Sequence, residues 1–564
     1  MAEPDQEKLS VLFTTEGTYP FMGGGVSTWC HILCEFLPEI DWEIFAVVAD
    51  PGGEDKYATH EFPQIRSIMK VPLWGAEEQA EYIDTRPFRF SFRRKVTTTQ
   101  RVIKTKFVPL FQELLEGFEN PGIDMWKYGK TVHEIYKYFQ AYDYRETMRS
   151  EATWNCWRDF HNNVAATDPT FRECDRPCLF DLTTALRWMF NMFMPIVATI
   201  PETDVSHASI AASTALANIV AKFEYGTPFL LTDHGVYIRE RYIACSAAEM
   251  SFFCKRFLVK LAGFYTKLCY LFADQISPCA HFNARWELPF GCVRDRPETI
   301  DFSDWDGTGI VPNIGSFPFI EPTYKALVDK DLMGVYEQET EFPWVRTIYN
   351  GVDCEKFKPG EKPEHLRGRP TCVALARVFP LKDVLTMIRS CAVVRKELEN
   401  IKYIVYGSLK ADPPYVEKCN KLIAELGLEE NFDLAGYHSK PAEAFWEGDI
   451  SVLSSISEGF PFTVLESMAA GVPVVGTDVG GCKEAIGTGA DSCGVVVPPQ
   501  NPEAFGQGVL KMLTNEDLRL EMARKGRERV LRLFQTSTSV DAYAESYRRL
   551  AQVKRARNAA TEAA

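Results

Sequence analysis

Short apolar runs alternate along the chain with stretches in which apolar residues recur at helical spacing. Near the N-terminus an apolar run over residues 9–14 precedes three glycines at 23–25, and helical spacing follows over 29–37. A second apolar run covers residues 44–49. This order predicts a β-α-β unit. Residues 57–176 are aromatic and charged with poor periodicity, and we interpret them as a mostly helical elaboration.

The same alternation continues to about residue 513. In the first half, strands are expected at 204–209 and 228–232, with helices over 213–222 and 247–273. In the second half, the expected strands, each followed by a helix, are 372–376, 403–406, 432–435, 450–454, 472–476 and 494–497. Apolar strands separated by helices indicate parallel sheets that are covered on both faces.

These patterns predict an α/β protein with two Rossmann-like, doubly wound domains. The expected division is a first domain over 1–345 with an insertion near 294–341, a second domain over 346–530, and a C-terminal helix and polar tail over 531–564. Ligands of open α/β sheets bind beyond the carboxyl ends of the strands. A cleft between the two domains is therefore the expected site.

Composition narrows the possible functions. The 62 Lys and Arg residues against 77 Asp and Glu give a net charge of −15, which argues against a nucleic-acid partner. The 16 cysteines form no CxxC pair, the nine histidines are scattered, and no metal constellation is expected. Such cysteine usage, an acidic start and the lack of a long uncharged apolar stretch predict a cytoplasmic protein.

The most informative motif runs from Ser455 to Glu466. A strand is expected to end before this motif and a helix to begin within it, so the amides of Phe462 and Thr463 should point outward as an anion site. Glu458 precedes the helix and Glu466 lies one turn inside it, which lets both carboxylates reach one ligand. A surface loop acid with an unrelated helix acid is the equally weighted alternative.

A second motif places two cations at a sheet edge. Arg377 closes an expected strand, and Lys382 opens the following helix. Arginine can bind a pyrophosphate in a bidentate manner, while lysine acts as a point charge. In isolation, two unconnected surface cations would be the default interpretation.

Two further motifs lie in the first half. Gly24 and Gly25 form a turn after the first strand and would let a ligand approach the backbone closely. Thr28 stands where a dinucleotide fingerprint needs a third small residue, although Asp50 partly fits a ribose-binding acid. His234 ends another strand; a structural role is more common there, but the expected cleft favours a functional one.

Together these motifs resemble glycosyltransferase family 4, and within it the PelF-type branch. The resemblance rests on the paired glutamates 458 and 466 around Ser-Glu-Gly-Phe-Pro, on Arg377 and Lys382, and on the turn at 349–353. The first half adds Thr-Glu-Gly-Thr-Tyr-Pro at 15–20 and Thr-Asp-His-Gly-Val-Tyr at 232–237. Asp233 stands where that branch commonly has Glu, and the 294–341 insertion has no counterpart, so the acceptor is the least determined feature.

The resemblance implies a GT-B fold and a retaining hexosyltransferase that acts in polysaccharide biosynthesis. It implies that Arg377 and Lys382 hold the diphosphate and that Glu466 contacts the ribose. Glu458 and Gly459 would lie beside the donor sugar, with Phe462 and Thr463 at the helix start. From the first domain, Gly24 and Gly25 would approach the phosphate or the sugar, and His234 would meet the sugar's far side. UDP-glucose is the expected donor, and a glycan or small molecule is the expected acceptor.

No cofactor or metal is expected, because fixed cations and helix amides can stabilise the departing diphosphate. The pairs Asp304/Asp306 and Asp329/Asp331 match a common DxD pattern, and we interpret them as solvated loop acids. Two alternatives stay open. One is an NAD-dependent oxidoreductase that uses the first β-α-β unit, and the other is a non-catalytic sugar-nucleotide-binding subunit of a polysaccharide assembly complex.

A basic segment over residues 86–106 reverses the charge of the chain locally. It contains eight Lys and Arg residues, no Asp or Glu, and Phe88, Phe90 and Phe92 at alternating positions. Such a segment suits an anionic membrane surface, which would make the protein peripheral to the membrane, or an acidic partner such as a membrane-bound polysaccharide synthase. The slightly favoured alternative is a solvated loop whose phenylalanines pack inward.

Overall fold

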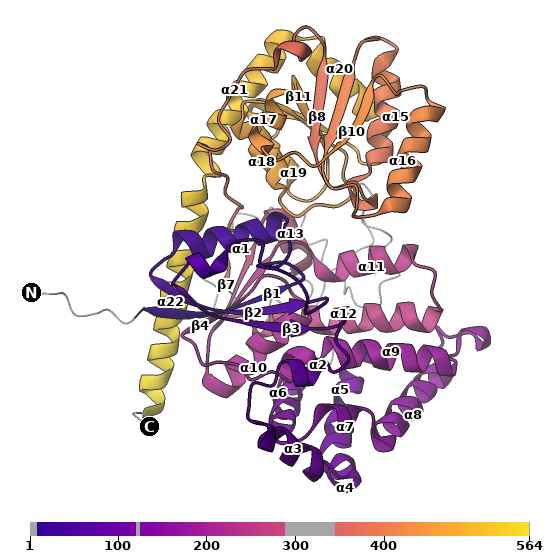
Figure 1. Cartoon of the computed structure of the whole chain (residues 1–564), viewed down its shortest axis with the longest axis vertical. Helices are drawn as coiled ribbons and strands as arrows, with labels where there is room; N and C mark the ends of the chain where they lie inside the picture. Colours follow the sequence, from indigo (N-terminus) through magenta and orange to yellow (C-terminus); the bar gives the residue numbers. More distant parts are fainter. Residues whose placement is uncertain (1–7, 120–124, 288–343, 563–564) are drawn as a thin grey trace, which may run out of the picture. The chain divides into compact units, whose positions relative to one another are not determined.

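A computed structural model of the chain describes residues 8–119, 125–287 and 344–562 (Figure 1). Its contacts divide the chain into two compact units. The first comprises Met1–Pro278, Ala284–Thr347 and Ala544–Ala564, and the second comprises Cys279–Asn283 and Ile348–Tyr543.

The first unit is built on a seven-stranded parallel sheet with the order β3-β2-β1-β4-β5-β6-β7. Its strands are β1 Leu9–Glu16, β2 Ile40–Val48, β3 Ile65–Pro72, β4 Val205–Ala208, β5 Phe229–Asp233, β6 Gln275–Pro278 and β7 Trp344–Val345. The central strands β4, β5 and β6 are buried along their whole length, as expected for a parallel sheet that is covered on both faces.

Helices cover this sheet. They are α1 Gly25–Phe36, α2 Gln79–Tyr82, α3 Phe88–Thr97, α4 Gln100–Val102, α5 Val108–Glu119, α6 Met125–Ala141, α7 Tyr144–Met148, α8 Glu151–Thr167, α9 Leu179–Met192, α10 Leu216–Tyr225, α11 Tyr237–Ala247 and α12 Phe252–Phe272. The helix α13 His281–Glu287 is divided between the two units after Asn283. Figure 1 shows α3 to α9 gathered on one side of the sheet. Alternate residues of β1 divide the two faces: Leu12 packs into the cluster formed with these helices. Phe13 instead contacts Trp29 of α1 and Trp42 of β2 on the other face.

The second unit contains a six-stranded parallel sheet with the order β10-β9-β8-β11-β12-β13. Its strands are β8 Thr371–Leu375, β9 Lys402–Tyr406, β10 Phe432–Gly436, β11 Ile450–Leu453, β12 Val474–Thr477 and β13 Gly494–Val497. The helices after residue 343 are α15 Val384–Arg395, α16 Pro413–Glu425, α17 Pro441–Trp446, α18 Phe462–Ala469, α19 Cys482–Ile486, α20 Pro502–Leu513, α21 Glu516–Leu533 and α22 Thr536–Glu562.

Strand alternation separates two cores in this unit. Val373 packs with α17, α18 and α19 on one face, while Cys372 and Ala374 pack with α15, α16 and α20 on the other. Every expected strand and helix of this unit is present, and the doubly wound prediction is confirmed.

The C-terminal helix is shared between the units. Sequence patterning places a domain boundary after residue 345, and the contacts divide the chain after Thr347. Residues 531–564 do not form a unit of their own, because the division falls at Tyr543/Ala544 within α22. The part that belongs to the first unit packs on its sheet: the Tyr547 ring contacts Trp42, and its hydroxyl lies 2.7 Å from Nδ1 of His207.

The strands β3, β6 and β7 and the helices α11 and α13 were not predicted. β3 lies at the edge of the sheet, carries Arg66 and Lys70, and ends at Pro72, so it lacks the continuous apolar character of the interior strands. Edge strands commonly carry charge and proline. β6 and β7 have only four and two residues, too few for a periodic signal. α11 has almost no amphipathic pattern to reveal it.

Candidate functional site

In the second unit, the predicted donor-binding residues lie along one edge of the sheet. β8 and β11 are neighbouring parallel strands, so their carboxyl ends lie side by side. Arg377 and Lys382 follow β8, and Glu458 follows β11. The structure therefore brings together the two motifs that are 76 residues apart at Lys382 and Glu458.

Lys382 and Glu458 form an ion pair. The Nζ atom of Lys382 donates to Oε1 of Glu458. The hydroxyl of Ser455 donates to the same oxygen at 2.6 Å. Both charged side chains are largely covered, with 22% and 11% of their surface exposed. An opposite charge and a hydroxyl thus hold the Glu458 carboxylate in one orientation.

Backbone contacts fix the loops that carry this pair. The Ser454 hydroxyl donates to the carbonyl oxygens of Lys382 and Asp383 at 2.9 and 3.0 Å. The amide of Ile456 donates to the carbonyl of Leu381 at 2.9 Å. Asp383 adopts a left-handed conformation, and its side chain caps α15. Lys382 is therefore presented from a fixed turn rather than from a free loop.

A third loop supports the segment at Glu458 and Gly459. The amide of Gly481 donates to the carbonyl of Gly459 at 2.6 Å. Gly480 has a φ of +55°, and a Cβ there would lie 2.0 Å from the carbonyl oxygen of Glu458. Only glycine allows this approach.

α18 begins directly after this segment. Pro461 is its N-cap, so Phe462 and Thr463 supply its first amides, which have no intrahelical acceptor. Together with the helix dipole they form a local anion-attracting end. Glu466 lies one turn inside the helix, and its carboxylate makes no hydrogen bond to any residue that the structure describes. Burial raises the pKa of Glu466 to about 7, although part of its surface stays exposed.

Arg377 is exposed at the same edge. Its guanidinium lies 5.1 Å from the centre of the Phe379 ring, which orients it by a cation–π contact. Within the described part of the chain it has no ion-pair partner. It is thus an oriented cation whose donors are available to a ligand.

In the first unit, the glycine turn follows β1. Gly24 is the N-cap of α1, has a φ of +151° and is exposed. A Cβ at Gly24 would meet nothing within 4 Å, so the backbone angle rather than crowding favours glycine. Gly25 is also exposed and begins α1. Both positions leave the backbone open to a ligand.

His234 follows β5, at the same edge of the first sheet. Its ring packs against Trp29 of α1, with ring centres 4.3 Å apart at 70°. Burial lowers the pKa of His234 to about 3, so the imidazole is neutral at physiological pH. Trp29 links His234 to the helix that Gly24 and Gly25 begin, a contact that no spacing in the sequence could reveal.

Asp233 lies beside His234 and is fully buried. The Tyr270 hydroxyl donates to its Oδ2 at 2.5 Å. Burial raises the pKa of Asp233 to about 7. Asp233 was noted in the sequence only as a departure from a motif, and its distant partner Tyr270 gave no signal there.

The predicted residues thus form two groups, one in each unit. The group at the edge of the second sheet comprises Arg377, Lys382, Glu458, Gly459, Phe462, Thr463 and Glu466. The group at the edge of the first sheet comprises Gly24, Gly25 and His234. Ser455 belongs to the sequence motif, but nothing in the sequence indicated its hydrogen bond to Glu458. The 294–341 insertion lies outside the described residues, and so do the aspartates at 304, 306, 329 and 331. Among the residues that the structure describes, no group of three side chains could hold a metal ion.

The basic segment forms α3 and α4 and continues toward α5. Phe88, Phe90 and Phe92 are 81%, 42% and 55% exposed, and no residue of α3 is buried. The favoured interpretation that these rings pack inward is therefore wrong. Arg94, in contrast, points back to the body of the unit and pairs with Asp84.

Two family models match the chain. Residues 9–295 match a domain of unknown function, DUF3492, and residues 358–529 match glycosyl transferases group 1. A trehalose synthase of Pyrococcus horikoshii is 30% identical over 181 residues, which is 31% of this chain and 43% of that protein. The chain spans about a quarter to a half of the length of the curated relatives it matches.

Solved structures share the fold over most of the chain. Sucrose-phosphate synthase from Thermosynechococcus elongatus superimposes with a TM-score of 0.54 at 13% identity, covering 96% of this chain and 99% of that one. The Anabaena protein HepE in complex with UDP-glucose gives 0.51 at 12% identity, covering 95% and 99%. The chain has the GT-B fold, as the sequence predicted.

Proposed function

The chain belongs to the DUF3492 family and carries a group 1 glycosyl-transferase domain, and from this premise we propose that it is a retaining glycosyltransferase that uses a UDP-sugar. The observation that carries the proposal is the edge of the second sheet, where an oriented Arg377, the Lys382–Glu458 pair and the start of α18 lie together. Glucose is the proposed sugar, and a glycan is the proposed acceptor.

The proposed donor rests on two lines of support. The family 4 resemblance of the motifs implies a nucleotide sugar, and its PelF-type features favour UDP-glucose. A solved structure of the same fold holds UDP-glucose, although its 12% identity extends only to the fold. Cations and helix amides match the diphosphate, while Glu466 offers acceptor oxygens for ribose hydroxyls.

The proposed chemistry follows from where charge develops. The bond between the sugar's anomeric carbon and the diphosphate breaks, and the leaving UDP takes the electron pair. Arg377, Lys382 and the α18 amides stabilise its negative charge. The acceptor hydroxyl attacks the same face of the sugar, and its proton passes to the departing phosphate oxygen. No protein nucleophile is required, and His234 and Glu458 contact the sugar.

The test is a donor screen on the full chain. UDP-, GDP- and ADP-sugars are assayed for hydrolysis and for transfer to saccharides, and the anomeric configuration of the product is read by NMR. UDP-glucose turnover with retention is expected. Inversion, or preference for another nucleotide, contradicts the corresponding part of the proposal. A thermal shift with NAD but not UDP would favour the oxidoreductase alternative, and UDP binding without turnover would favour a non-catalytic subunit.

Activity is expected to survive metal removal. Arg377, Lys382 and the start of α18 already supply the positive potential that a divalent ion would provide. The measurement is donor turnover after dialysis against EDTA, with and without added manganese. Complete loss that manganese restores would contradict this expectation and would bring back Asp304 and Asp306 as ligand candidates.

Affinity for UDP-glucose is expected to fall on acidification below about pH 7. The pKa of Glu466 is raised to about 7 by burial, so the carboxyl is protonated below that pH and accepts ribose hydroxyls poorly. Because a single group titrates, the affinity for UDP-glucose should fall by at most about tenfold per pH unit and should reach a plateau above pH 8. UDP-glucose is the suitable probe because its pyrophosphate diester does not titrate there.

Glu466→Gln is the control for this pH dependence. It removes the titrating group but keeps an amide of the same shape, so binding should become weaker and nearly independent of pH. Asp233 has a pKa of about 7 as well. A pH dependence that persists in Glu466→Gln would therefore assign the effect to a group other than Glu466.

We also propose that α3 contacts an anionic membrane surface. Its exposed phenylalanines can enter the headgroup region, while exposed Arg89, Arg93 and Lys95 face anionic lipids. The charge of this helix opposes the chain's net charge of −15. In the part of the chain that the structure describes, no helix is long and apolar enough to span a bilayer.

Cosedimentation with anionic vesicles at low salt is expected, with release as salt rises because the attraction is screened. Replacing Arg89, Arg93 and Lys95 by Gln should reduce pelleting severalfold and leave donor hydrolysis unchanged. The charge-matched control replaces the exposed Lys421, Lys440 and Arg524 in the second unit. Equal pelleting with neutral vesicles, or equal loss in both triple variants, would contradict a role for α3.

A further inference from the structure

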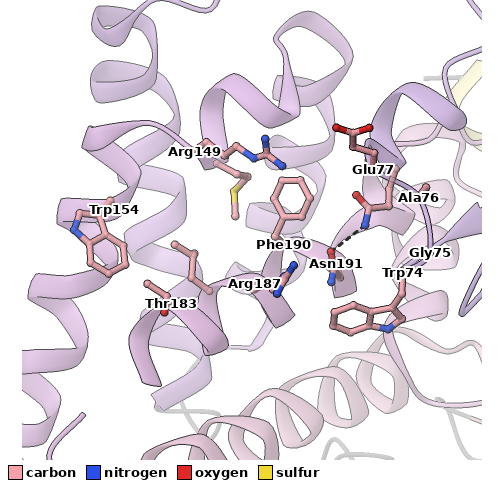
Figure 2. A pocket seen from close by; sticks show the side chains of 13 residues that line it. Trp74, Gly75, Ala76, Glu77, Arg149, Trp154, Thr183, Arg187, Phe190 and Asn191 are labelled. Carbon is pink, nitrogen blue, oxygen red and sulfur yellow. Dashed lines mark hydrogen bonds between the residues drawn. The ribbon is translucent and has the colours of Figure 1, made fainter. Parts of the chain in front are cut away.

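A pocket of about 730 Å³ opens in the first unit beside the end of β3 (Figure 2). Its volume lies within the roughly 300–1,000 Å³ of small-molecule sites. The β3–α2 connection forms one wall, and the end of α7 together with α8 and α9 forms the rest. None of the motifs that the sequence indicated as functional contributes to it.

The backbone that forms the first wall is rigidly held. The amides of Leu73 and Trp74 donate to Val48 and Ala49 at 2.8 Å, which continues the pairing beyond β3. Gly75 then turns the chain with a φ of +74°, and a Cβ there would lie 2.9 Å from the Cβ of Asp50. The turn therefore fixes the position from which the Trp74 side chain projects.

Three aromatic side chains line the pocket. Trp74 is 37% exposed, and Trp154 and Phe190 are half-buried. Figure 2 shows the two tryptophans at opposite ends with Phe190 between them. Phe190 is held by a ring contact with Tyr144 at 4.8 Å. The electron-rich faces of such rings attract the positively polarised C–H groups of a sugar ring.

The polar groups of the pocket include both donors and acceptors. Arg187 and Glu77 are exposed, and neither has an ion-pair or side-chain hydrogen-bond partner among the described residues. Asn191 is 3% exposed, and its Oδ1 accepts from Gln79 Nε2 at 3.5 Å. The guanidinium of Arg149 lies 3.6 Å from the Glu78 carboxylate and 5.8 Å from the centre of the Phe190 ring.

This mixture selects one ligand chemistry. Each hydroxyl of a saccharide both donates and accepts, so it can use a guanidinium, a carboxylate and an amide together. A phosphate group could use Arg187 but would leave Glu77 without a donor and beside a like charge, and a hydrocarbon would leave all of these polar groups desolvated and unpaired. Aromatic faces beside unpaired polar groups of both kinds therefore favour a carbohydrate.

The pocket also lies where an extended acceptor could reach it. Trp74 follows β3, and Gly24 follows β1, at the same carboxyl edge of one sheet. Two strand spacings of about 4.8 Å separate these strands, so the ends of β3 and β1 are offset laterally by about 10 Å. A chain of a few sugar units that starts at the glycine turn can cover this offset.

We propose that this pocket binds a sugar unit of a glycan acceptor, several units away from the one that receives the transferred sugar. The proposal rests on the proposed function, because it specifies the acceptor of the same enzyme. The pocket would make the protein selective for oligosaccharides over monosaccharides. Trp74 and Trp154 would stack on sugar faces, while Arg187, Glu77 and Asn191 would bond to hydroxyls.

The test uses the full chain and a panel of neutral and acidic oligosaccharides of two to eight units. Binding is measured by tryptophan fluorescence and calorimetry, and UDP-glucose hydrolysis is measured without acceptor. Wild type is expected to bind at least one series, with affinity rising with length. Arg187→Ala and Trp74→Ala should weaken that binding at least tenfold and leave hydrolysis unchanged.

Arg158→Ala, at a half-exposed arginine of α8 that does not line the pocket, is the matched control. Because Arg187 is exposed, its replacement keeps the fold, so the result does not depend on the tryptophan variant alone. Equal saccharide affinity in wild type and Arg187→Ala, or no saccharide binding in the millimolar range, overturns the pocket assignment. Saccharide binding without any UDP-sugar turnover would instead contradict the proposed function and leave the pocket assigned.

Discussion

Arg377→Ala is expected to lower kcat/KM for the nucleotide-sugar donor by about ten- to a hundredfold while the protein stays folded. A charge-assisted hydrogen bond contributes roughly 1.5–3 kcal/mol, and each 1.4 kcal/mol corresponds to a factor of ten. Arg377 is exposed and oriented only by the Phe379 ring. Its removal therefore leaves no buried group unpaired, and the loss should appear in donor turnover rather than in stability.

The design separates a specific contact from a general effect of charge. Arg377→Lys should recover only part of the activity, because lysine cannot make the bidentate contact of a guanidinium. Arg389→Ala, at another exposed arginine of the second unit, should retain wild-type turnover. Melting temperatures are measured for all three variants. Wild-type turnover by folded Arg377→Ala would exclude this residue from the donor site.

The architecture of the second unit was predictable because its strands are buried on both faces. Runs such as Val472 to Gly476 are continuously apolar, and each is followed by a helix with its own apolar face. β3 was missed for the opposite reason: as an edge strand it carries Arg66 and Lys70 and needs no apolar run. The pocket beside Trp74 was missed together with it.

The site was predictable as a set of residue types but not as a set of contacts. Glycines, cations and paired glutamates at strand ends carry a local signal, because turns and helix starts impose residue types there. The pairing of Lys382 with Glu458 depends on the order of β8 and β11 in the sheet, which no local pattern encodes. The same holds for His234 and Trp29, which are brought together by strand order.

Exposure was the other property that the sequence could not determine. Alternating phenylalanines in the basic segment suited both an inward-packed loop and a segment that lies on an anionic surface. α3 exposes all three rings, because the helical period distributes alternating residues around the helix instead of onto one face.

Glu458→Gln is expected to lower kcat by about 10²–10³-fold, the cost of removing one preorganised electrostatic group from an active site. Positive charge develops at the anomeric carbon as UDP departs, and the carboxylate that Lys382 and Ser455 hold in place would face it. Glutamine keeps the shape and the hydrogen bonds but loses the charge. The effect should therefore appear in the chemical step rather than in folding.

Nucleotide affinity provides the decisive second readout. In the free protein Lys382 is paired with Glu458, so a diphosphate must compete for it. Glu458→Gln weakens that competition because it removes the opposite charge, and the Kd for UDP should stay equal or decrease while kcat falls. Glu443→Gln, at a half-exposed glutamate paired with Lys440, is the matched control and should change neither value. A parallel loss of UDP affinity and kcat would place Glu458 on the nucleotide instead of the sugar, and an unchanged kcat would remove it from the catalytic site.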